Sequence, residues 1–542
     1  MRSKSCGTSH EPDMSTVIRP LKAISGLFSD KSLTKKAYLN ALTVLLEYAA
    51  SLLVGFLITP LMVTGLGAYF FGMWQVLNRL VGYINPASGR PGFALKATLA
   101  NQQASSDYDQ KRRYVGSTLL IWLLFLPFLV CVGGVLSWFV PYWIHAPTTY
   151  VWVVRIVSGL LVMNMIVSTL SSIPQVTLQG ENLGYKRMGM SVVLVLVGGS
   201  LTWLALHLGT GIIGVATAVV ASTLATGLFY LWVVKSNTPW FGVARPRRTD
   251  IHQMLNLSWW FMGWNLVTNL LIASDVVVLG LLNSVESVTN YSLTKYVPET
   301  LIGVIVIVVF GIVPGLGSIV GTGDFERAIR LRNEIISFTW LVATALGASI
   351  LIWNRTFISL WVGAEHYSGA LPNLFIVIAA LQLALIRSDG NVIDLTLRLS
   401  QKVLLGFLSV TVSIIAASLL VGYFRLGIAG LCIGVIAGRS IISLGYPILI
   451  GRFLNIKFSS QSNAILRPTL VTIFLFLIAM GFSTLAVDLG WSGLSGWFMF
   501  IVSASLTGIL MLVLSFYVGL SSAQRSSIVR RSRAVIATDA SA

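Results

Sequence analysis

Long apolar runs separated by short polar connections make up almost the whole of this chain. A helix that crosses a bilayer needs about 20 mostly apolar residues, and fourteen runs reach that length. The predicted spans cover residues 38–64, 69–98, 114–142, 151–178, 189–208, 212–234, 254–281, 291–320, 333–358, 371–397, 403–422, 427–450, 467–488 and 494–519. The pattern therefore predicts an all-α polytopic membrane protein with 14 transmembrane helices.

The connections between these spans alternate in charge. Seventeen Lys and Arg residues lie in connections that follow even-numbered spans, whereas connections that follow odd-numbered spans have only Lys295, near 282–296, and Arg425. Because basic loops remain in the cytoplasm, this alternation places both tails, residues 1–37 and 520–542, on the cytoplasmic side. An even number of spans requires the same arrangement, so the two arguments agree.

The sequence contains an internal repeat. Residues 211–222 match residues 427–438 at an offset of 216, and residues 140–143 match residues 358–361 at an offset of 218. The repeat predicts two lobes of six helices each, as in transporters built from parallel repeats. The predicted parts are an N-lobe over 38–234, a basic cytoplasmic linker over 235–253, a C-lobe over 254–451, and two extra helices with their preceding loop over 452–519.

Composition agrees with a membrane protein and disfavours several other classes. Only 10% of the residues are charged and 55% are hydrophobic, whereas soluble proteins carry about 25% charged residues. The net charge of +18 follows from the basic loops and indicates no nucleic-acid partner. The histidines show no metal-ligand spacing, the three cysteines lie far apart, and the chain has no P-loop motif. Because no large outer loop carries catalytic acids, we expect neither an enzyme nor a cofactor.

The predicted tenth span carries an unusual group of charges, within residues 374–402. On an ideal helix Arg387, Asp394 and Arg398 fall within about 60° of one another, and Asp389 lies nearly opposite. Ionisable groups at membrane depth are costly and usually mark a functional site. The equivalent part of the first half, near residues 170–172, has no charge. We therefore assign Arg387 and Asp389 to a transport path, and Asp394 with Arg398 to an interface between helices.

Arginines outnumber acids among the charges within the spans. Arginine stays charged and binds phosphate through two parallel hydrogen bonds, which favours a cavity for an anionic, phosphate-bearing substrate. The candidate cavity cations are Arg387, Arg439, Arg79 and Arg90. The candidate acids for ion coupling are Asp275, Asp389 and Glu47, since burial raises the pKa of a carboxyl group toward neutrality. The same charges are also compatible with ion pairs that only hold helices together.

Several segments together resemble one known group of transporters. The segment 57–74, LITPLMVTGLGAYFFGMW, is similar to the first-hairpin signature of bacterial polysaccharide-export flippases. These are the Wzx-like O-antigen and capsule transporters of the multidrug/oligosaccharidyl-lipid/polysaccharide exporter superfamily. The segments 274–280 with 289–293, and 310–314 with 323–324, resemble the opening of the second half and the end of span 8. The resemblance extends over about residues 38–452.

The resemblance implies a two-lobed helical bundle around a central cavity in the bacterial plasma (inner) membrane. It implies that the protein moves a polyprenyl-pyrophosphate-linked oligosaccharide between leaflets by alternating access, driven by a proton or sodium gradient. Membrane lipids, a polysaccharide polymerase and a chain-length regulator are the partners that this role suggests. One departure concerns residues 86–93, where many relatives carry an acid and this chain has none.

Two other classes stay open. A drug or cation antiporter of the same superfamily shares the twelve-span core, and an acidic cavity would favour it. A scaffold that does not transport, and instead recruits envelope enzymes through its basic tails, would tolerate loss of Arg387 and Arg439 together.

Overall fold

The computed structural model describes residues 33–526, apart from residues 89–90, 104, 188, 322, 396–398, 486–490 and 523. Arg90, one of the candidate cavity cations, and Arg398 therefore lie outside the described residues. The described part of the chain is helical throughout and contains no strand.

The helices follow the order that the apolar runs predict. The α-helices are α2 (Leu33–Ile84), α3 (Pro91–Asn101), α4 (Tyr108–Trp143), α5 (Val151–Gly180), α6 (Met190–His207), α7 (Gly211–Asn237), α8 (Arg248–Leu282), α9 (Val285–Gly321), α10 (Phe325–Trp361), α11 (Ala370–Leu395), α12 (Leu399–Ser418), α13 (Gly427–Leu454), α14 (Phe458–Leu485) and α15 (Gly493–Leu514). Short 3₁₀ turns connect several of them, and π-helical turns follow α12 and α15.

Twelve helices in the described residues are long and apolar enough to cross a membrane, whereas fourteen spans were predicted. The predicted spans 38–64 and 69–98 both lie along α2, which counts once although Gly67 interrupts it with a non-helical φ of 81° and ψ of 163°. The second of these spans also ends earlier than predicted, at Ile84, because the chain turns before Pro91 begins α3. The predicted span 291–320 lies in α9, which has 37 residues but is not among the twelve.

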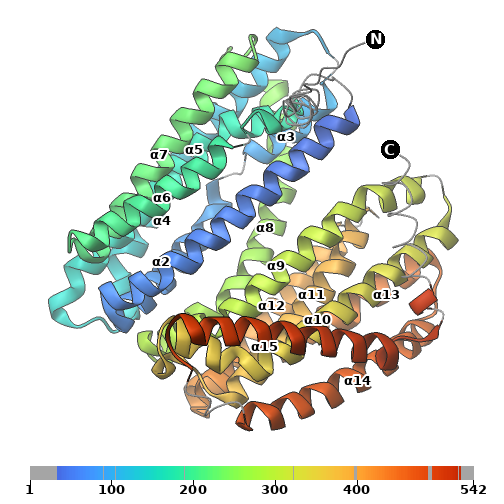
Figure 1. The fold of residues 1–542 in the computed structure, drawn as a ribbon. Coiled ribbons are helices and arrows are strands. Elements are labelled where there is room, and N and C mark those ends of the chain that lie inside the picture. Colours follow the sequence, from blue (N-terminus) through green and yellow to red (C-terminus); the bar gives the residue numbers. More distant parts are fainter. Residues whose placement is uncertain are drawn as a thin grey trace, which may run out of the picture.

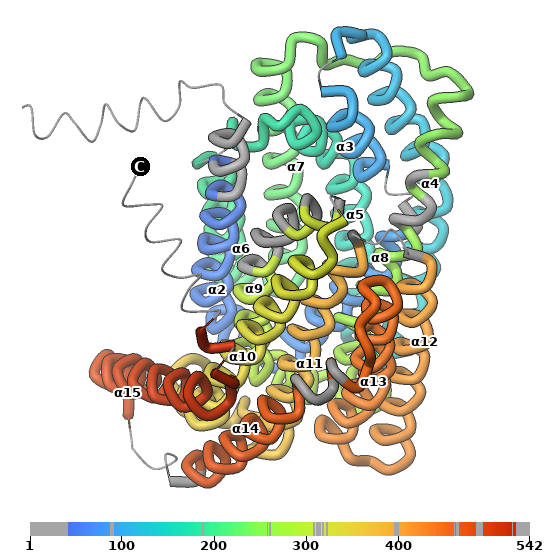
Figure 2. The backbone as a smooth tube through the Cα atoms, turned by 90° about the vertical axis from the view of Figure 1, so that its right-hand side faces the viewer, coloured from blue at the N-terminus to red at the C-terminus, as the bar shows by residue number. Residues whose placement is uncertain are grey.

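The helices form two lobes (Figure 1). Helices α2 to α7 form one lobe and α9 to α13 form the other, with α8 between them. The last two helices, α14 and α15, both pack against α10 on the outside of the second lobe (Figure 2). The first described turn of α2 and the end of α15 lie at the same end of the bundle (Figure 1).

The lobes lie close together at one end of the molecule and diverge toward the other (Figure 1). At the contact, the Thr289 hydroxyl donates to the Ala68 carbonyl over 2.5 Å. The Trp361 indole N–H donates to the Phe56 carbonyl over 2.8 Å, and the two rings stack. Proline at position 60 has no N–H to give to that carbonyl, so a donor from the other lobe replaces the missing helix bond.

Helix α8 belongs to both lobes. Near its start, Met254 is fully buried in a cluster with Leu95 and Tyr114 of the N-lobe. Farther along, Val267 packs closely against Gly406 of α12. A Cβ atom at position 406 would lie only 2.5 Å from Val267 Cγ1. The same helix therefore joins the linker side of one lobe to the core of the other.

The internal repeat is visible in the backbone. Gly211 and Gly427 start α7 and α13 with positive φ angles of 63° and 53°. His145 and Gly363 also have positive φ angles, and each lies two residues after the end of its helix, α4 or α10. Residues paired by the sequence offsets therefore have positive φ angles at equivalent helix starts and ends.

Candidate functional site

A cavity of about 120 Å³ lies among α8, α9, α11 and α13 of the C-lobe. We name it the first cavity. Its charged lining residues are Asp275, Lys295, Glu299, Arg387 and Arg439. Three of these, Asp275, Arg387 and Arg439, are residues that the sequence selected. They come from three different helices, so the fold brings together charges that are up to 164 residues apart.

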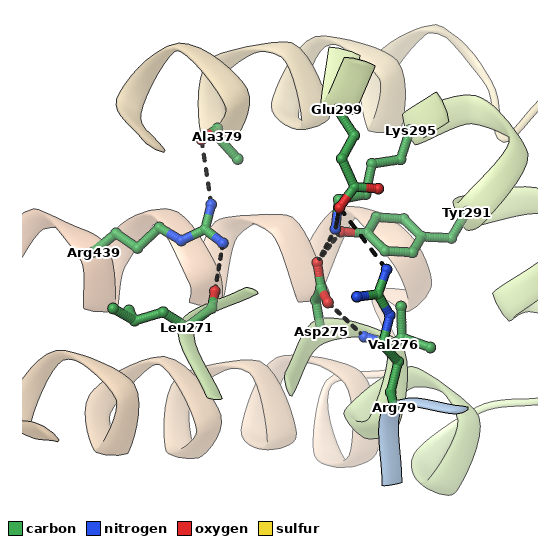
Figure 3. Close-up of polar contacts among 9 residues, drawn as sticks. All are labelled: Arg79, Leu271, Asp275, Val276, Tyr291, Lys295, Glu299, Ala379 and Arg439. Carbon is green, nitrogen blue, oxygen red and sulfur yellow. Dashed lines mark hydrogen bonds and ion pairs between the residues drawn. The ribbon is translucent and has the colours of Figure 1, made fainter. Parts of the chain in front are cut away.

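Asp275 is buried at the centre of a hydrogen-bonded cluster (Figure 3). The Lys295 ammonium and the Tyr291 hydroxyl each donate to its Oδ2 over 2.6 Å. The backbone N–H of Val276 donates to Oδ1 over 2.8 Å. A buried carboxylate is stable only when its charge is paired and its lone pairs are satisfied, and these three donors meet both needs.

Lys295 was counted with the connection before the predicted span 291–320, and the structure places it well inside α9. The helix starts at Val285, six residues before the predicted span. Ser284 precedes this start, and its hydroxyl accepts a hydrogen bond over 3.1 Å from the backbone N–H of Ser287. A serine hydroxyl that accepts a hydrogen bond from the backbone N–H three residues later is typical of a helix N-cap. Ser284 was therefore the signal in the sequence for this earlier start.

Proline 298 disturbs the same helix beside the first cavity. It has no N–H to donate to the Thr294 carbonyl, four residues earlier. The Asn354 side chain of α10 donates to that carbonyl instead, over 2.9 Å. The bond ties α9 to α10 at the level of Lys295 and holds this part of the wall in place.

Arg439 is buried, with 4% of its surface exposed. Its guanidinium donates to the carbonyls of Leu271 over 2.7 Å and Ala379 over 3.3 Å (Figure 3). Its Nε atom has no hydrogen-bond partner. No carboxylate of the described residues forms an ion pair with it, so its hydrogen bonds there go to neutral carbonyls.

Arg387 is half-buried and lines both the first cavity and a neighbouring one. Within the described chain it forms neither a hydrogen bond nor an ion pair. The lining of the first cavity thus contains three cations against two carboxylates, and Arg387 and Arg439 form no ion pair with any described residue. An uncompensated charge in a low-dielectric site is costly, and an anionic ligand relieves that cost.

A chain of alternating charges connects this cavity to the N-lobe. Lys295 lies 3.7 Å from Glu299, and Glu299 lies 3.9 Å from Arg79 of α2 (Figure 3). Sequence reasoning selected Arg79 but not Glu299, which follows Pro298 in what is otherwise an apolar segment. The pair of Arg79 and Glu299 is one of the polar contacts that link the two lobes.

The structure places the other candidates away from the first cavity. Asp389 accepts two hydrogen bonds of 2.9 Å from Arg332 of α10, and Arg332 also donates to Gln461 of α14 over 2.9 Å. Glu47 lies half-buried on α2 and lines neither cavity. Asp394 pairs with Lys402 over 2.5 Å.

A family model described as polysaccharide biosynthesis protein matches residues 37–320, just over half of the sequence. The chain belongs to the polysaccharide biosynthesis protein family. The resemblance to polysaccharide-export proteins is therefore confirmed at the level of the family. The matched region contains Arg79, Asp275, Lys295 and Glu299 and ends before Arg387. No curated protein matches the chain.

The fold is similar to that of several solved transporters. The lipid II flippase MurJ, in an inward closed conformation, has a TM-score of 0.63 and 13% identity, and covers 91% of this chain and 99% of its own. A MATE transporter in complex with MaD3S has a TM-score of 0.55 and 14% identity, covering 77% and 95%. A MOP superfamily transporter from Pyrococcus furiosus has a TM-score of 0.55 and 15% identity, also covering 77% and 95%.

Proposed function

We propose that this protein flips a polyprenyl-pyrophosphate-linked oligosaccharide from the inner to the outer leaflet of a bacterial plasma membrane. The cargo is a repeat unit of O-antigen, capsule or exopolysaccharide. The observation that carries the proposal is the pair of cations, Arg387 and Arg439, which line one cavity without a carboxylate partner. Membership of the polysaccharide biosynthesis protein family supports the glycan part of the cargo.

The pyrophosphate binds between Arg387 and Arg439 in this account. A guanidinium offers several N–H donors in a planar fork that fits phosphate oxygens. The Nε of Arg439 is a buried donor with no partner in the cavity as it stands. A pyrophosphate oxygen supplies that partner and neutralises the local charge at the same time.

Alternating access follows from the way the two lobes meet. In this structure α2 contacts the other lobe along much of its length, from the Tyr48 hydroxyl that donates to the Thr300 carbonyl to the ion pair of Arg79 and Glu299. Transport requires contacts at one end to open while new contacts form at the other, so that the cavity faces each leaflet in turn. Helix α8, which packs on both lobes, is the element about which we expect the lobes to turn.

Asp275 is the acid that we assign to coupling with a proton or sodium ion. Its carboxylate is neutralised by Lys295 here. Uptake of a proton or sodium ion at Asp275 releases Lys295 toward Glu299, which already lies 3.7 Å from it. The released lysine then competes with Arg79 for Glu299, and this connects the ion to the contact between lobes.

The topology we propose has fourteen spans with both termini in the cytoplasm. The two halves of α2 on either side of Gly67 are separate spans, and α9 is a further span. Basic loops at the ends of the even-numbered spans support the orientation. Fusion of a periplasm-dependent reporter to the linker, residues 238–247, should give no activity, whereas fusion to residues 363–369 should give full activity.

The proposal is tested by restoring surface glycan in cells that lack the gene. We expect Arg387→Ala and Arg439→Ala to reduce surface glycan at least tenfold at unchanged protein level in the membrane. Arg452→Ala, on α13 but not among the lining residues of the cavity, is the matched control and should restore glycan fully. Normal glycan with both site variants would refute the anion site and leave the scaffold role. Increased drug sensitivity on deletion, with normal glycan, would instead favour a drug antiporter.

A further inference from the structure

A second cavity of about 200 Å³ lies beside the first, lined by α8, α9, α11, α12 and α13. Ile272, Leu383 and Arg387 line both cavities. We propose that this second cavity binds the sugar next to the pyrophosphate, and that it is a subsite for a neutral pyranose ring. The inference rests on the proposed function and adds to it the residues that read the glycan.

The residues shared by the two cavities allow one ligand to occupy both. Arg387 borders the two cavities and has no partner among the described residues. A phosphate held by Arg387 therefore lies at the boundary. The group attached to that phosphate points into the second cavity when the rest of the pyrophosphate occupies the first.

The charges of the second cavity are balanced, unlike those of the first. Lys402 is buried and donates to Asp394 over 2.5 Å and to the Gly390 carbonyl over 3.1 Å. Its ammonium also lies 4.0 Å from the ring centre of Trp264. Apart from Arg387 at the boundary, the lining thus contains one cation with its own carboxylate partner. This wall favours a neutral polar ligand over a second phosphate.

Polar groups with unused hydrogen-bonding capacity face this cavity. The Asn391 side chain makes no hydrogen bond to any described residue, and an amide offers both donors and an acceptor. Among the described residues, Asp394 is bonded to Lys402 through Oδ1 and keeps Oδ2 as an acceptor. The Thr268 hydroxyl donates to the Trp264 carbonyl and keeps its acceptor sites. Sugar hydroxyls both donate and accept, so this set matches the rim of a pyranose ring.

Apolar surface and size fit the same ligand. Trp264, which is half-buried, supplies aromatic surface for the C–H face of a sugar, whereas Tyr446 belongs to the wall but is only 2% exposed. The volume of about 200 Å³ is below the ~300–1,000 Å³ of pockets that hold drug-sized ligands, which leaves space for about one ring. Gly390 adds no side chain to this wall. A Cβ atom at this position would be in van der Waals contact with the Tyr446 ring at 3.5 Å and with Lys402 at 3.7 Å, so a larger side chain would extend into the cavity.

The test measures binding of five lipids to the purified full-length chain. The probes are polyprenyl pyrophosphate and the same lipid carrying one glucose, galactose, N-acetylglucosamine or glucuronate residue. We expect at least one neutral sugar to increase affinity about tenfold over the bare lipid. Gly390→Leu, which fills the cavity, and Asn391→Ala should each remove this gain and leave affinity for the bare lipid within twofold of wild type.

Two variants separate the possible failures. Arg439→Ala should weaken all five probes, because it acts on the pyrophosphate. Leu404→Ala, at an exposed position of α12, should change none. The subsite is refuted if no neutral sugar improves on the bare lipid, if only glucuronate does, or if the gain survives both Gly390→Leu and Asn391→Ala. A wild type that binds none of the five lipids overturns the proposed function and the subsite together.

Discussion

Arg79 and Glu299 meet across the boundary between the two lobes, 3.9 Å apart, from α2 and α9. Both side chains are partly exposed, with 32% and 41% of their surfaces accessible, and an ion pair of this kind stabilises by about 1 kcal/mol at most. That is too little to hold a fold together, but it is enough to bias a balance between two arrangements of the lobes.

We predict that Glu299→Gln shifts this balance toward separated lobes by up to about fivefold, the equivalent of about 1 kcal/mol. Distances between spin labels, one on each lobe, measure the shift. Glu326→Gln is the matched control, because Glu326 pairs with Arg330 inside a single helix. A distance distribution that is the same in Glu299→Gln and wild type would show that the pair does not bias the lobes.

The bidentate pair of Arg332 and Asp389 leads to a prediction about stability. Asp389→Ala leaves a buried arginine without its partner, which costs about 3–5 kcal/mol of unfolding free energy. The double replacement Arg332→Met with Asp389→Leu should lose much less, because no charge stays buried. Thermal unfolding in detergent measures both.

Transport by the same variants separates structure from function. We expect the surface glycan formed per folded molecule to be equal in Asp389→Ala and wild type. If Asp389→Ala is as stable as the wild type but does not transport, Asp389 takes part in transport, as its position in the sequence suggested.

The contact between Trp361 and Phe56 leads to a prediction with an internal rescue. Trp361→Phe removes the donor and leaves the Phe56 carbonyl unsatisfied, which costs about 1–3 kcal/mol. Adding Pro60→Ala to this variant supplies a backbone N–H four residues later and should recover part of the loss. Melting temperatures of the two variants provide the measurement. If Pro60→Ala gives no recovery, the indole stabilises the lobe contact by stacking alone.

Much of the fold could be predicted from the sequence. Apolar runs predicted the helices in order, because a helix that crosses lipid needs a long continuous run of apolar residues. The ends of helices that were predicted from charged residues were less accurate than the order of the helices. Arg332 and Lys402 read as loop cations, yet both are buried, because each meets a carboxylate that only the folded chain brings near.

The candidate site was predictable only in part. Asp275, Arg387 and Arg439 stood out as charges within apolar runs, and the structure brings all three to one cavity. Lys295 and Glu299 were missed, although both lie in the predicted span 291–320: Lys295 was counted with the preceding connection, and Glu299 was not singled out as a charge within the span. Which charge pairs with which depends on how helices pack. Asp389 and Arg332 are 57 residues apart, and no local pattern indicates that they meet.

The most direct test of the central claim compares two lipids that differ only in charge. Binding of polyprenyl pyrophosphate and of uncharged polyprenol to the purified protein isolates the contribution of the pyrophosphate. Hydrogen bonds to a charged group contribute about 1.5–3 kcal/mol each, so we predict that the pyrophosphate binds at least tenfold tighter and that Arg439→Ala removes most of this difference. Equal affinities for the two lipids, or a difference that persists in Arg439→Ala and Arg387→Ala, would contradict the account.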